Sequence, residues 1–373
     1  MTVLFLCLAS NAVREIAGYA NAFRRRGVAV QFVPSGTPLN GDLIELVGQC
    51  PERPSLILHP DADFPIMPRG LNRIPIPTAL LQADPYAYTH RRLRWAMLFD
   101  YVLLMHEGFE ERFRAAGHRA PLTLIHAVDR AYFEGPEDCR VFEVGMVGRV
   151  DGANYRTRHF VLTALEKEFQ MNEWRRQHTY QELADVYRKS RIVVNVGRDD
   201  YPTDVSLRFA EAMAAGALFV TQLPSELDRM GFQDGTHYAG FRHYDELASL
   251  LRNYLSGEAM RRRIADCARE KVMREHTYDA RVEQWLNLVR QDEGKLSAPA
   301  RGWPEARVRL TCLDYFAGNG ALDCALAELR EIAGQSVPKA AVGAALLGRA
   351  WEKRSRRRIK ARWIELTRGS RKL

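Results

Sequence analysis

The chain has 373 residues, of which 46% are hydrophobic and 27% are charged, as is usual for a soluble globular protein of two or three domains. No apolar run reaches the roughly 18 residues that span a bilayer, and the first strand is too short for a signal peptide and lacks its basic segment. The six scattered cysteines include no CxxC pair, so we expect a cytoplasmic protein without a disulfide or zinc framework. The net charge of +8 comes from residues 295–373, with 17 basic and 7 acidic residues against 37 and 39 in residues 1–294, so the nearly neutral body is not expected to bind nucleic acid.

The first third of the chain alternates apolar strands with helices. Strands are predicted over residues 3–8, 28–33, 55–59, 77–81, 101–105 and 122–126. Helices are predicted over residues 14–26, 39–47, 91–99 and 109–116. This alternation is typical of right-handed β-α-β crossovers, so we expect an α/β domain with a parallel sheet.

The same pattern starts again after residue 140. Strands are predicted over 141–147, 192–196 and 218–221, and helices over 159–168, 181–189 and from 244 to about 290. A second doubly wound domain is therefore expected. The predicted domains are residues 1–133 and 134–290, followed by a linker over 291–304 that is rich in Gly, Pro, Ser and charge, and by a basic helical extension over 305–373.

The most informative segment is 191–217, which predicts a buried strand, a loop and a helix. Arg208 and Glu211 lie near the start of that helix, and Gly216 follows two alanines at its end. A charged pair that opens a helix beside the carboxyl end of a strand is typical of sites for phosphorylated ligands in α/β proteins.

The second domain resembles the GT-B glycosyltransferases of the group 1 type, and within them the spore-maturation-protein-like glycosyltransferases. The resemblance rests on the order and spacing of four motifs, namely GMVGR at 145–149, YRKSRIVVN at 187–195, LRFAEAMAAG at 207–216 and VMREHTY at 272–278. It implies two Rossmann-like domains that face each other across a cleft. It also implies transfer of a sugar, of the hexosyl type, from a nucleotide-sugar co-substrate to an acceptor on the first domain. Family members generally need no metal cofactor.

The resemblance also implies which residues bind the donor. Glu211 would accept hydrogen bonds from two ribose hydroxyls, while Arg149 and Arg156, with Arg158 as an alternative to Arg156, would meet the diphosphate. Further donor-site candidates are Gly148, Asn195 and Arg208. Each has a plainer interpretation: the arginines as solvated surface charges, Asn195 as a turn residue, and Glu211 as an exposed carboxylate paired with Arg208.

The sequence departs from the family at two positions. Thr203 stands where many retaining members carry a glutamate, eight positions before Glu211, so the stereochemical outcome stays open. Asp199, Asp200 and Asp204 are possible substitutes or simple loop residues. Ala83 stands where related enzymes carry a histidine, which leaves Asp84.

We expect Asp84 to be the catalytic base or an acceptor contact, or alternatively a helix N-cap before Pro85. Ser10 and Asn11, which follow the first strand, are acceptor-side candidates or turn residues. Three histidines are weaker candidates, namely His59, His90 and His126. The two departures favour the alternative of a catalytically inactive GT-B-like binding or scaffold protein. The acceptor is not specified by the sequence and is a glycan, a lipid-linked molecule or a protein.

The C-terminal region carries a competing pattern. Residues 308–322 read as an apolar strand followed by D-x-F-x-G-x-G-x-L, which resembles motif I of S-adenosylmethionine-dependent methyltransferases. Too few residues follow for the rest of such a domain, so a methyltransferase fusion is the lesser alternative. Residues 349–373 predict a basic amphipathic helix, which would contact the inner face of a membrane or dock on the body through its tryptophans. The sequence does not call for a metal, since its DxD triplet, Asp61-Ala-Asp63, lies in a proline-rich loop.

Overall fold

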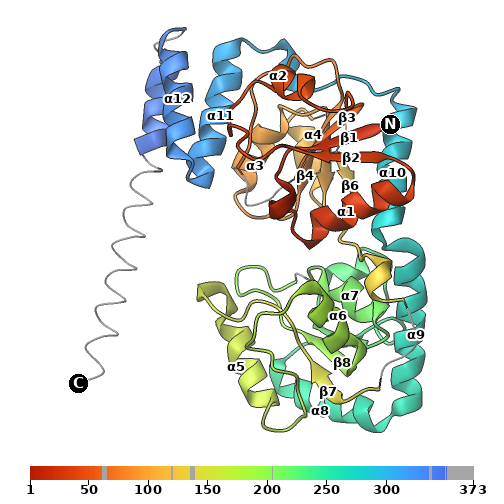
Figure 1. Ribbon diagram of the computed structural model, residues 1–373. Coiled ribbons are helices and arrows are strands. Elements are labelled where there is room, and N and C mark those ends of the chain that lie inside the picture. The colour runs from red at the N-terminus through yellow and green to blue at the C-terminus, as the bar shows by residue number, and fades with distance from the viewer. Residues whose placement is uncertain are drawn as a thin grey trace. The chain divides into compact units, whose positions relative to one another are not determined.

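The computed structural model describes residues 1–60, 65–118, 121–134, 139–203, 205–335, 338–348 and 350. The chain forms two compact α/β units, each with its own parallel sheet and hydrophobic core (Figure 1). The first unit comprises Met1–Val13, Gly27–Thr123 and Val289–Leu373, and the second comprises Arg14–Arg26 and Leu124–Leu288. The predicted fold class, two Rossmann-like α/β domains with a helical C-terminal region, is confirmed.

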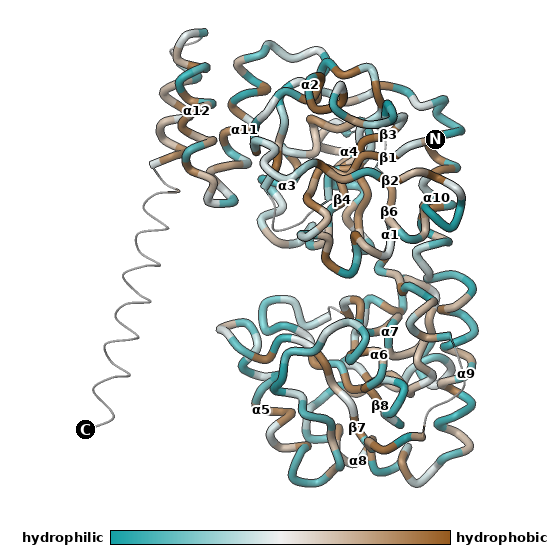
Figure 2. Tube along the Cα trace, viewed as in Figure 1, coloured by the Kyte–Doolittle hydropathy of each residue, from teal (hydrophilic) through white to brown (hydrophobic). Residues whose placement is uncertain are grey.

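The sheet of the first unit has six parallel strands in the order β2-β1-β3-β4-β5-β6. The strands are β1 (Thr2–Phe5), β2 (Ala29–Phe32), β3 (Leu56–His59), β4 (Thr78–Gln82), β5 (Tyr101–Leu104) and β6 (Pro121–Thr123). Every residue of β1, β3, β4 and β5 is buried. Continuous burial is expected for parallel strands that are covered on both faces, and Figure 2 shows the hydrophobic colour concentrated on these strands.

The helices of the first unit come from both ends of the chain. They are α2 (Leu43–Gly48), α3 (Thr89–Ala96), α4 (Glu110–Ala115), α11 (Glu305–Asn319) and α12 (Leu322–Ala333). Helix α11 lies next to α3, and α12 lies beside α11 (Figure 1). Leu313 and Phe316 of α11 are fully buried in the core that the sheet also supplies. Helices α11 and α12 are therefore part of the first unit.

The strand predicted at the start of the methyltransferase-like motif is wrong. Residues 308–319 are helical, and α11 ends where Gly320 adopts the left-handed conformation, with φ of 79°. The segment has no strand followed by a glycine loop, so the structural basis for a methyltransferase cofactor site is missing there. The sequence pattern misled because α11 is buried on most of its circumference, which removes the helical periodicity.

The segment predicted as a linker is anchored to the first sheet. Asp100, fully buried after α3, receives two hydrogen bonds of 2.8 Å from the guanidinium of Arg301 and one of 2.8 Å from the backbone N–H of Ala298. Thr78 donates to the same carboxylate through its N–H and its hydroxyl. Burial alone would raise the pKa of Asp100, but these donors lower it below its ordinary value.

The second unit contains a four-stranded parallel sheet in the order β10-β9-β8-β7. The strands are β7 (Phe142–Gly145), β8 (Ser190–Asn195), β9 (Leu218–Gln222) and β10 (Ala239–Phe241). Its helices are α1 (Arg14–Arg25), α5 (Arg156–Leu165), α6 (Tyr180–Arg188), α7 (Arg208–Ala214), α8 (Tyr244–Ser256), α9 (Glu258–Glu275) and most of α10 (Tyr278–Gln291). The strands match the predicted ones except for β10, which the sequence pattern did not indicate.

The two units do not follow the chain order that the predicted domain boundaries assume. Helix α1 lies between β1 and β2 in the sequence, yet it belongs to the second unit. The chain also returns to the first unit after Leu288, and helices α11 and α12, which were predicted to belong to a separate extension, pack into that unit.

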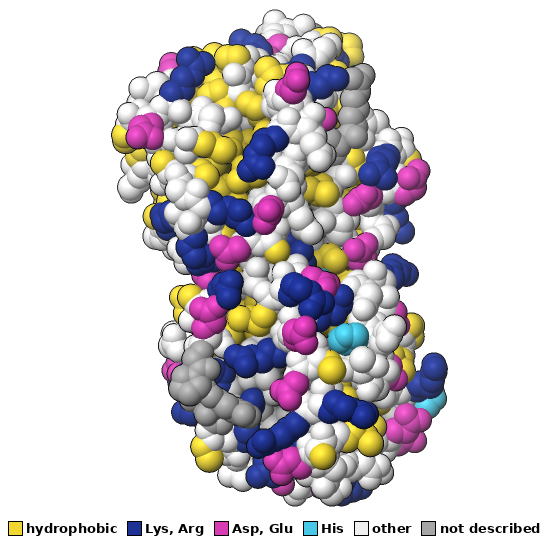
Figure 3. All heavy atoms as spheres, turned by 90° about the vertical axis from the view of Figure 1, so that its right-hand side faces the viewer, with side chains coloured by type: hydrophobic (Ala, Val, Ile, Leu, Met, Phe, Trp, Pro, Cys, Tyr) yellow, Lys and Arg dark blue, Asp and Glu magenta, His cyan; other side chains and the backbone are white. Residues whose placement is uncertain are grey.

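Acidic and basic side chains are interspersed on the face seen in Figure 3. This mixed surface agrees with the nearly neutral body counted from the sequence. Within the described part of the chain, none of the helices is long and apolar enough to cross a membrane.

Candidate functional site

The candidate site of the second unit lies at the carboxyl edge of its sheet. Strands β7 and β8 run parallel, so the segment after Gly145 and the end of β8 at Asn195 reach the same edge. Helix α7 follows the loop that leaves β8. In open α/β sheets, ligands bind outside this edge. The structure therefore brings together Gly148, Asn195, Arg208 and Glu211, which the sequence analysis singled out.

Gly148 is required by close packing. Its φ is 148°, and a Cβ atom at this position would lie 2.5 Å from Nη2 of Arg208. A larger residue would have to displace the arginine. The glycine thus lets the loop after β7 lie directly against helix α7.

The buried side chain of Arg208 connects the loop after β7 to the end of β8. Its Nε and Nη2 donate to the carbonyl oxygen of Val147 at 3.2 and 3.1 Å, and its Nη1 donates to the side-chain oxygen of Asn195. Asn195 in turn donates to Thr221 of β9 at 3.0 Å. Arg208 and Asn195, 6% and 1% exposed, therefore hold the loop and two strands in position.

Glu211 is buried and faces a cation from another part of the chain. Its side chain is 1% exposed, and its Oε1 lies 3.0 Å from Nη1 of Arg14 on helix α1. The expected alternative, an exposed carboxylate paired with Arg208, is therefore wrong. Burial raises the pKa of Glu211, and the positive charges of Arg14 and Arg208 oppose that rise.

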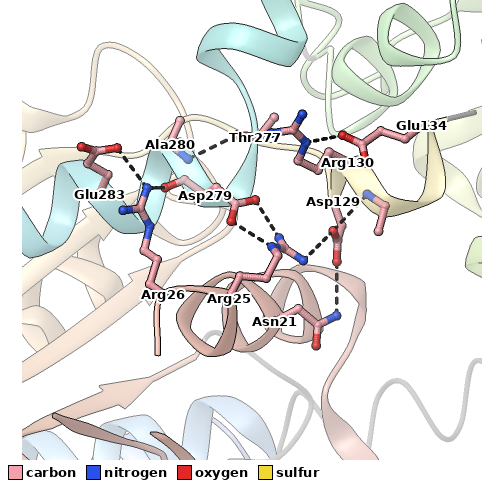
Figure 4. A network of polar contacts seen from close by, with 11 residues as sticks. Asn21, Arg25, Arg26, Asp129, Arg130, Glu134, Thr277, Asp279, Ala280 and Glu283 are labelled. Atoms are coloured by element: carbon pink, nitrogen blue, oxygen red, sulfur yellow. Dashed lines mark hydrogen bonds and ion pairs between the residues drawn. The ribbon is translucent and has the colours of Figure 1, made fainter. Parts of the chain in front are cut away.

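Helix α1 is fastened to the second unit by ionic and aromatic contacts. Arg25 pairs with Asp129 at 3.2 Å and with Asp279 of α10 at 2.7 Å, and Asn21 also donates to Asp129, as Figure 4 shows. The ring of Tyr19 packs edge-on against Tyr278 with centroids 5.0 Å apart. These contacts place Arg14 next to Glu211. The sequence analysis identified the helix but missed this role, because no local pattern connects two residues almost 200 positions apart.

The two arginines proposed for the diphosphate are both exposed. Arg149 follows the glycine loop, and Arg156 begins helix α5, where its backbone N–H donates to Asp199 at 3.0 Å. Arg158, the alternative, is buried and donates to the carbonyl oxygens of Val196 at 2.8 Å and Arg149 at 2.6 Å. It therefore has a structural role.

The loop aspartates serve the loop itself. Asp199 caps helix α5, and Asp200 pairs with Arg198 at 2.8 Å. Asp204, the third suggested substitute for the missing glutamate, lies outside the described residues, as do Asp61 and Asp63. In the described part of the chain, no group of three or more His, Cys, Asp and Glu is placed to hold a metal ion.

The acceptor-side candidates lie in the first unit, at the carboxyl edge of its own sheet. Asp84 follows β4, is half-buried and accepts a hydrogen bond of 3.1 Å from the hydroxyl of Tyr86. It does not cap a helix, because α3 begins at Thr89 after Tyr88. Ser10 and Asn11 form a short 3-10 turn after β1, in which the Ser10 hydroxyl donates to the Asn11 side chain at 3.4 Å.

The histidine candidates divide by environment. His59 is 1% exposed, and its Nε2 lies 2.5 Å from the carbonyl oxygen of Ile66 while its ring packs against Phe99 and Tyr315. It is a core residue of the first unit. His126 is also buried, whereas His90 is exposed.

Comparison with known families supplies the chemical context of the second unit. Residues 146–287 match a family model described as glycosyl transferase-like. This segment is similar to glycosyl transferase-like domains. The match begins at the end of β7, runs through Asn195, Arg208 and Glu211, and ends within α10. No curated protein matches the sequence significantly.

Two solved structures share the fold over 78% of the chain. Anabaena HepE, crystallised with UDP-glucose, aligns with a TM-score of 0.55 and 16% identity over 78% of this chain and 100% of its own. Sucrose-phosphate synthase from Thermosynechococcus elongatus aligns with a TM-score of 0.53 and 12% identity over 78% and 98%. TarM aligns with a TM-score of 0.47 and 11% identity over 62% of this chain. The chain spans about half of the length of TarM, 54%.

These neighbours establish the fold expected from the sequence, that of the GT-B glycosyltransferases. The narrower likeness to spore-maturation-protein-like members stays a prediction. The predicted membrane contact through residues 349–373 falls, apart from position 350, outside the described residues.

Proposed function

We propose that this protein transfers a sugar from a nucleotide-sugar donor to an acceptor. The observation that carries the proposal is Glu211, a buried carboxylate at the carboxyl edge of the second sheet, within the segment that matches glycosyl transferase-like domains. Its Oε1 has no hydrogen-bond partner among the described residues. A buried acceptor with spare capacity is suited to ligand hydroxyl groups.

The donor would use the edge formed by residues 145–216. Glu211 would accept from two ribose hydroxyls, and the Gly148 loop would let the diphosphate approach the backbone. Arg149 and Arg156 are the exposed cations that would offset the charge of the leaving diphosphate, so the proposal assigns no metal cofactor. Arg208 and Asn195 would hold this edge rather than touch the ligand, because their side chains bond each other and neighbouring strands.

The acceptor would use the first unit. Asp84 is the proposed general base, since it lies half-buried at the carboxyl end of β4 with one hydrogen bond to Tyr86, and Ser10 and Asn11 are proposed acceptor contacts. The hexosyl type of the transferred group and the kind of acceptor, a glycan, a lipid-linked molecule or a protein, belong to the same proposal.

Two measurements test the function. A nucleoside diphosphate at 100 times its dissociation constant should stabilise the protein by about 2.7 kcal/mol, which a thermal shift with UDP, GDP, ADP and TDP would detect. Release of free nucleotide from the matching nucleotide sugar would then show turnover. Binding without turnover by any donor and acceptor tried would instead favour the inactive binding protein that Thr203 and Ala83 suggest.

A further inference from the structure

The ion pair between Arg14 and Glu211 joins two distant parts of the sequence inside the second unit. The Arg14 side chain is 33% exposed and the Glu211 side chain 1%, and their charged atoms are 3.0 Å apart. The contact lacks hydrogen-bond geometry, because Oε1 of Glu211 has no hydrogen-bond partner among the described residues. Arg14 therefore places a positive charge beside the carboxylate and leaves Oε1 of Glu211 able to accept a hydrogen bond.

The groups around Glu211 show why this charge matters. Glu15 on α1 adds a second negative charge, while Arg14 and Arg208 supply the positive ones. The guanidinium of Arg208 is committed to Val147 and Asn195. Tyr180 and Tyr187 of α6 also lie within electrostatic range, and burial raises the pKa of both, to about 12 for Tyr187, so both stay neutral near pH 7.

Arg14 is held by a helix that has little freedom to move away. Arg26, the residue directly after α1, pairs with Glu283 of α10 at 2.9 Å, and Arg25 pairs with Asp129 and Asp279 (Figure 4). Gly18 packs so closely that a Cβ atom there would lie 2.2 Å from the ring of Tyr278. The helix is thus held against the second unit near its middle and at its C-terminal end.

We propose that Arg14 is a positioning residue of the donor site. It keeps the Glu211 carboxylate charged and holds it where it can accept hydrogen bonds from ribose hydroxyls. This inference rests on the proposed function. A charged carboxylate accepts hydrogen bonds on both oxygens and binds hydroxyls more strongly than the neutral acid does. Arg14, which lies near the start of the sequence, thereby contributes to the nucleotide site proposed for residues 145–216.

The test compares ribose recognition in Arg14→Gln, Arg14→Lys and the wild type. The probes are the nucleoside diphosphate that binds the wild type and its 2′-deoxy form, titrated by calorimetry at pH 6, 7 and 9. A charged hydrogen bond is worth roughly 1.4 kcal/mol more than a neutral one, so Arg14→Gln should lose about tenfold in affinity for the ribonucleotide at pH 7.

The pH profile separates positioning from general structural damage. Removing Arg14 removes a charge that opposes the raised pKa of Glu211, so the loss should grow at pH 6 and shrink at pH 9 as the carboxyl ionises. Affinity for the 2′-deoxy form should change less, and Arg14→Lys should restore most of the ribonucleotide affinity. Arg24→Gln, an exposed position on the same helix, is the matched control and should leave the preference for ribose unchanged.

The outcomes are distinct. An unchanged affinity in Arg14→Gln, or a loss that is equal at every pH and equal for both nucleotides, overturns the role of Arg14 while the proposed function stands. If no nucleoside diphosphate binds the wild type, the proposed function fails and this inference falls with it. Circular dichroism of each variant verifies that it is folded.

Discussion

At the scale of single residues, Glu211 combines high burial with incomplete hydrogen bonding. Keeping a carboxylate away from water is unfavourable unless it is paired and hydrogen-bonded. Here the pairing comes from Arg14, and one oxygen remains without a hydrogen bond in the described part of the chain. Such a group contributes little to stability, so its presence at this sheet edge is better explained by binding.

Replacing Glu211 should therefore separate stability from function. We expect Glu211→Gln to change the free energy of unfolding by no more than about 1 kcal/mol, because removal of the buried charge offsets loss of the ion pair. Because the pKa of Glu211 is raised in the folded state, this group stabilises the folded protein at low pH. That contribution is lost as the pH rises above about 4.3, the ordinary pKa of a glutamate. Urea unfolding at pH 7 measures the change. A destabilisation of several kcal/mol would assign Glu211 a structural role instead.

Gly148 tests the packing of the loop on helix α7. We expect Gly148→Ala to destabilise the protein by about 2 kcal/mol, since the new Cβ would collide with Arg208 and φ is positive. Gly152→Ala is the matched control: its φ is 108°, but its Cβ would meet only Tyr155 at 3.9 Å. Urea unfolding of both variants isolates the collision, and equal costs would show that Arg208 gives way freely.

At the scale of elements, the C-terminal helices are held to the first unit by a buried ion pair as well as by apolar packing. Asp100 is fully buried and receives Arg301, whose side chain is 18% exposed. Glu328 of α12, also buried, pairs with Arg309 of α11 at 3.0 Å and accepts from Asn40 at 3.2 Å. Helices α11 and α12 thus pack as part of the first unit.

Arg301 should be one of the costly positions of the first unit. We expect Arg301→Ala to destabilise by about 3–5 kcal/mol, because it leaves Asp100 buried without its partner. The lowered pKa of Asp100 means that the wild-type contribution is present above pH 4 and is lost as pH falls further. Urea unfolding at pH 7 and pH 4 measures both effects. Arg330→Ala on α12, for which no ion pair is described, is the control, and a similar cost in both would contradict the role of the pair.

Sequence patterns predicted some elements and not others for physical reasons. Strands such as β5 and β8 are short apolar runs bounded by turn residues, and Gly148, Asn195 and Glu211 could be placed at one edge because parallel strands end together. Helix α11 was misread because burial on most sides hides its periodicity. Arg14 was missed because its partnership depends on tertiary packing of α1.

At the scale of the whole molecule, the two units divide the proposed roles between them. The second unit carries the segment that matches glycosyl transferase-like domains, together with the candidate donor residues. The first unit carries Asp84, Ser10 and Asn11, and it includes helices α11 and α12. The chain crosses between the units before and after α1, again between Thr123 and Leu124, and finally within α10.

The basic tail provides a prediction that is independent of the donor site. We expect the full chain to float with liposomes containing anionic lipid and a chain ending at residue 350 to remain behind, because basic residues of 351–373 would be attracted to the lipid charge. Ending at 350 spares Leu346 and Leu347, which pack against the core of the first unit. Equal flotation of the two chains would remove the membrane contact, and their nucleotide affinities should agree.

Nucleotide titration tests the central claim most directly. Calorimetry of the wild type and of Glu211→Gln with UDP, GDP, ADP and TDP asks whether this sheet edge binds a nucleoside diphosphate through the buried carboxylate. The account predicts that at least one of the four binds the wild type and that Glu211→Gln, still folded, binds it at least about tenfold more weakly. Binding of none of them to the wild type, or equal binding to both proteins, would contradict it.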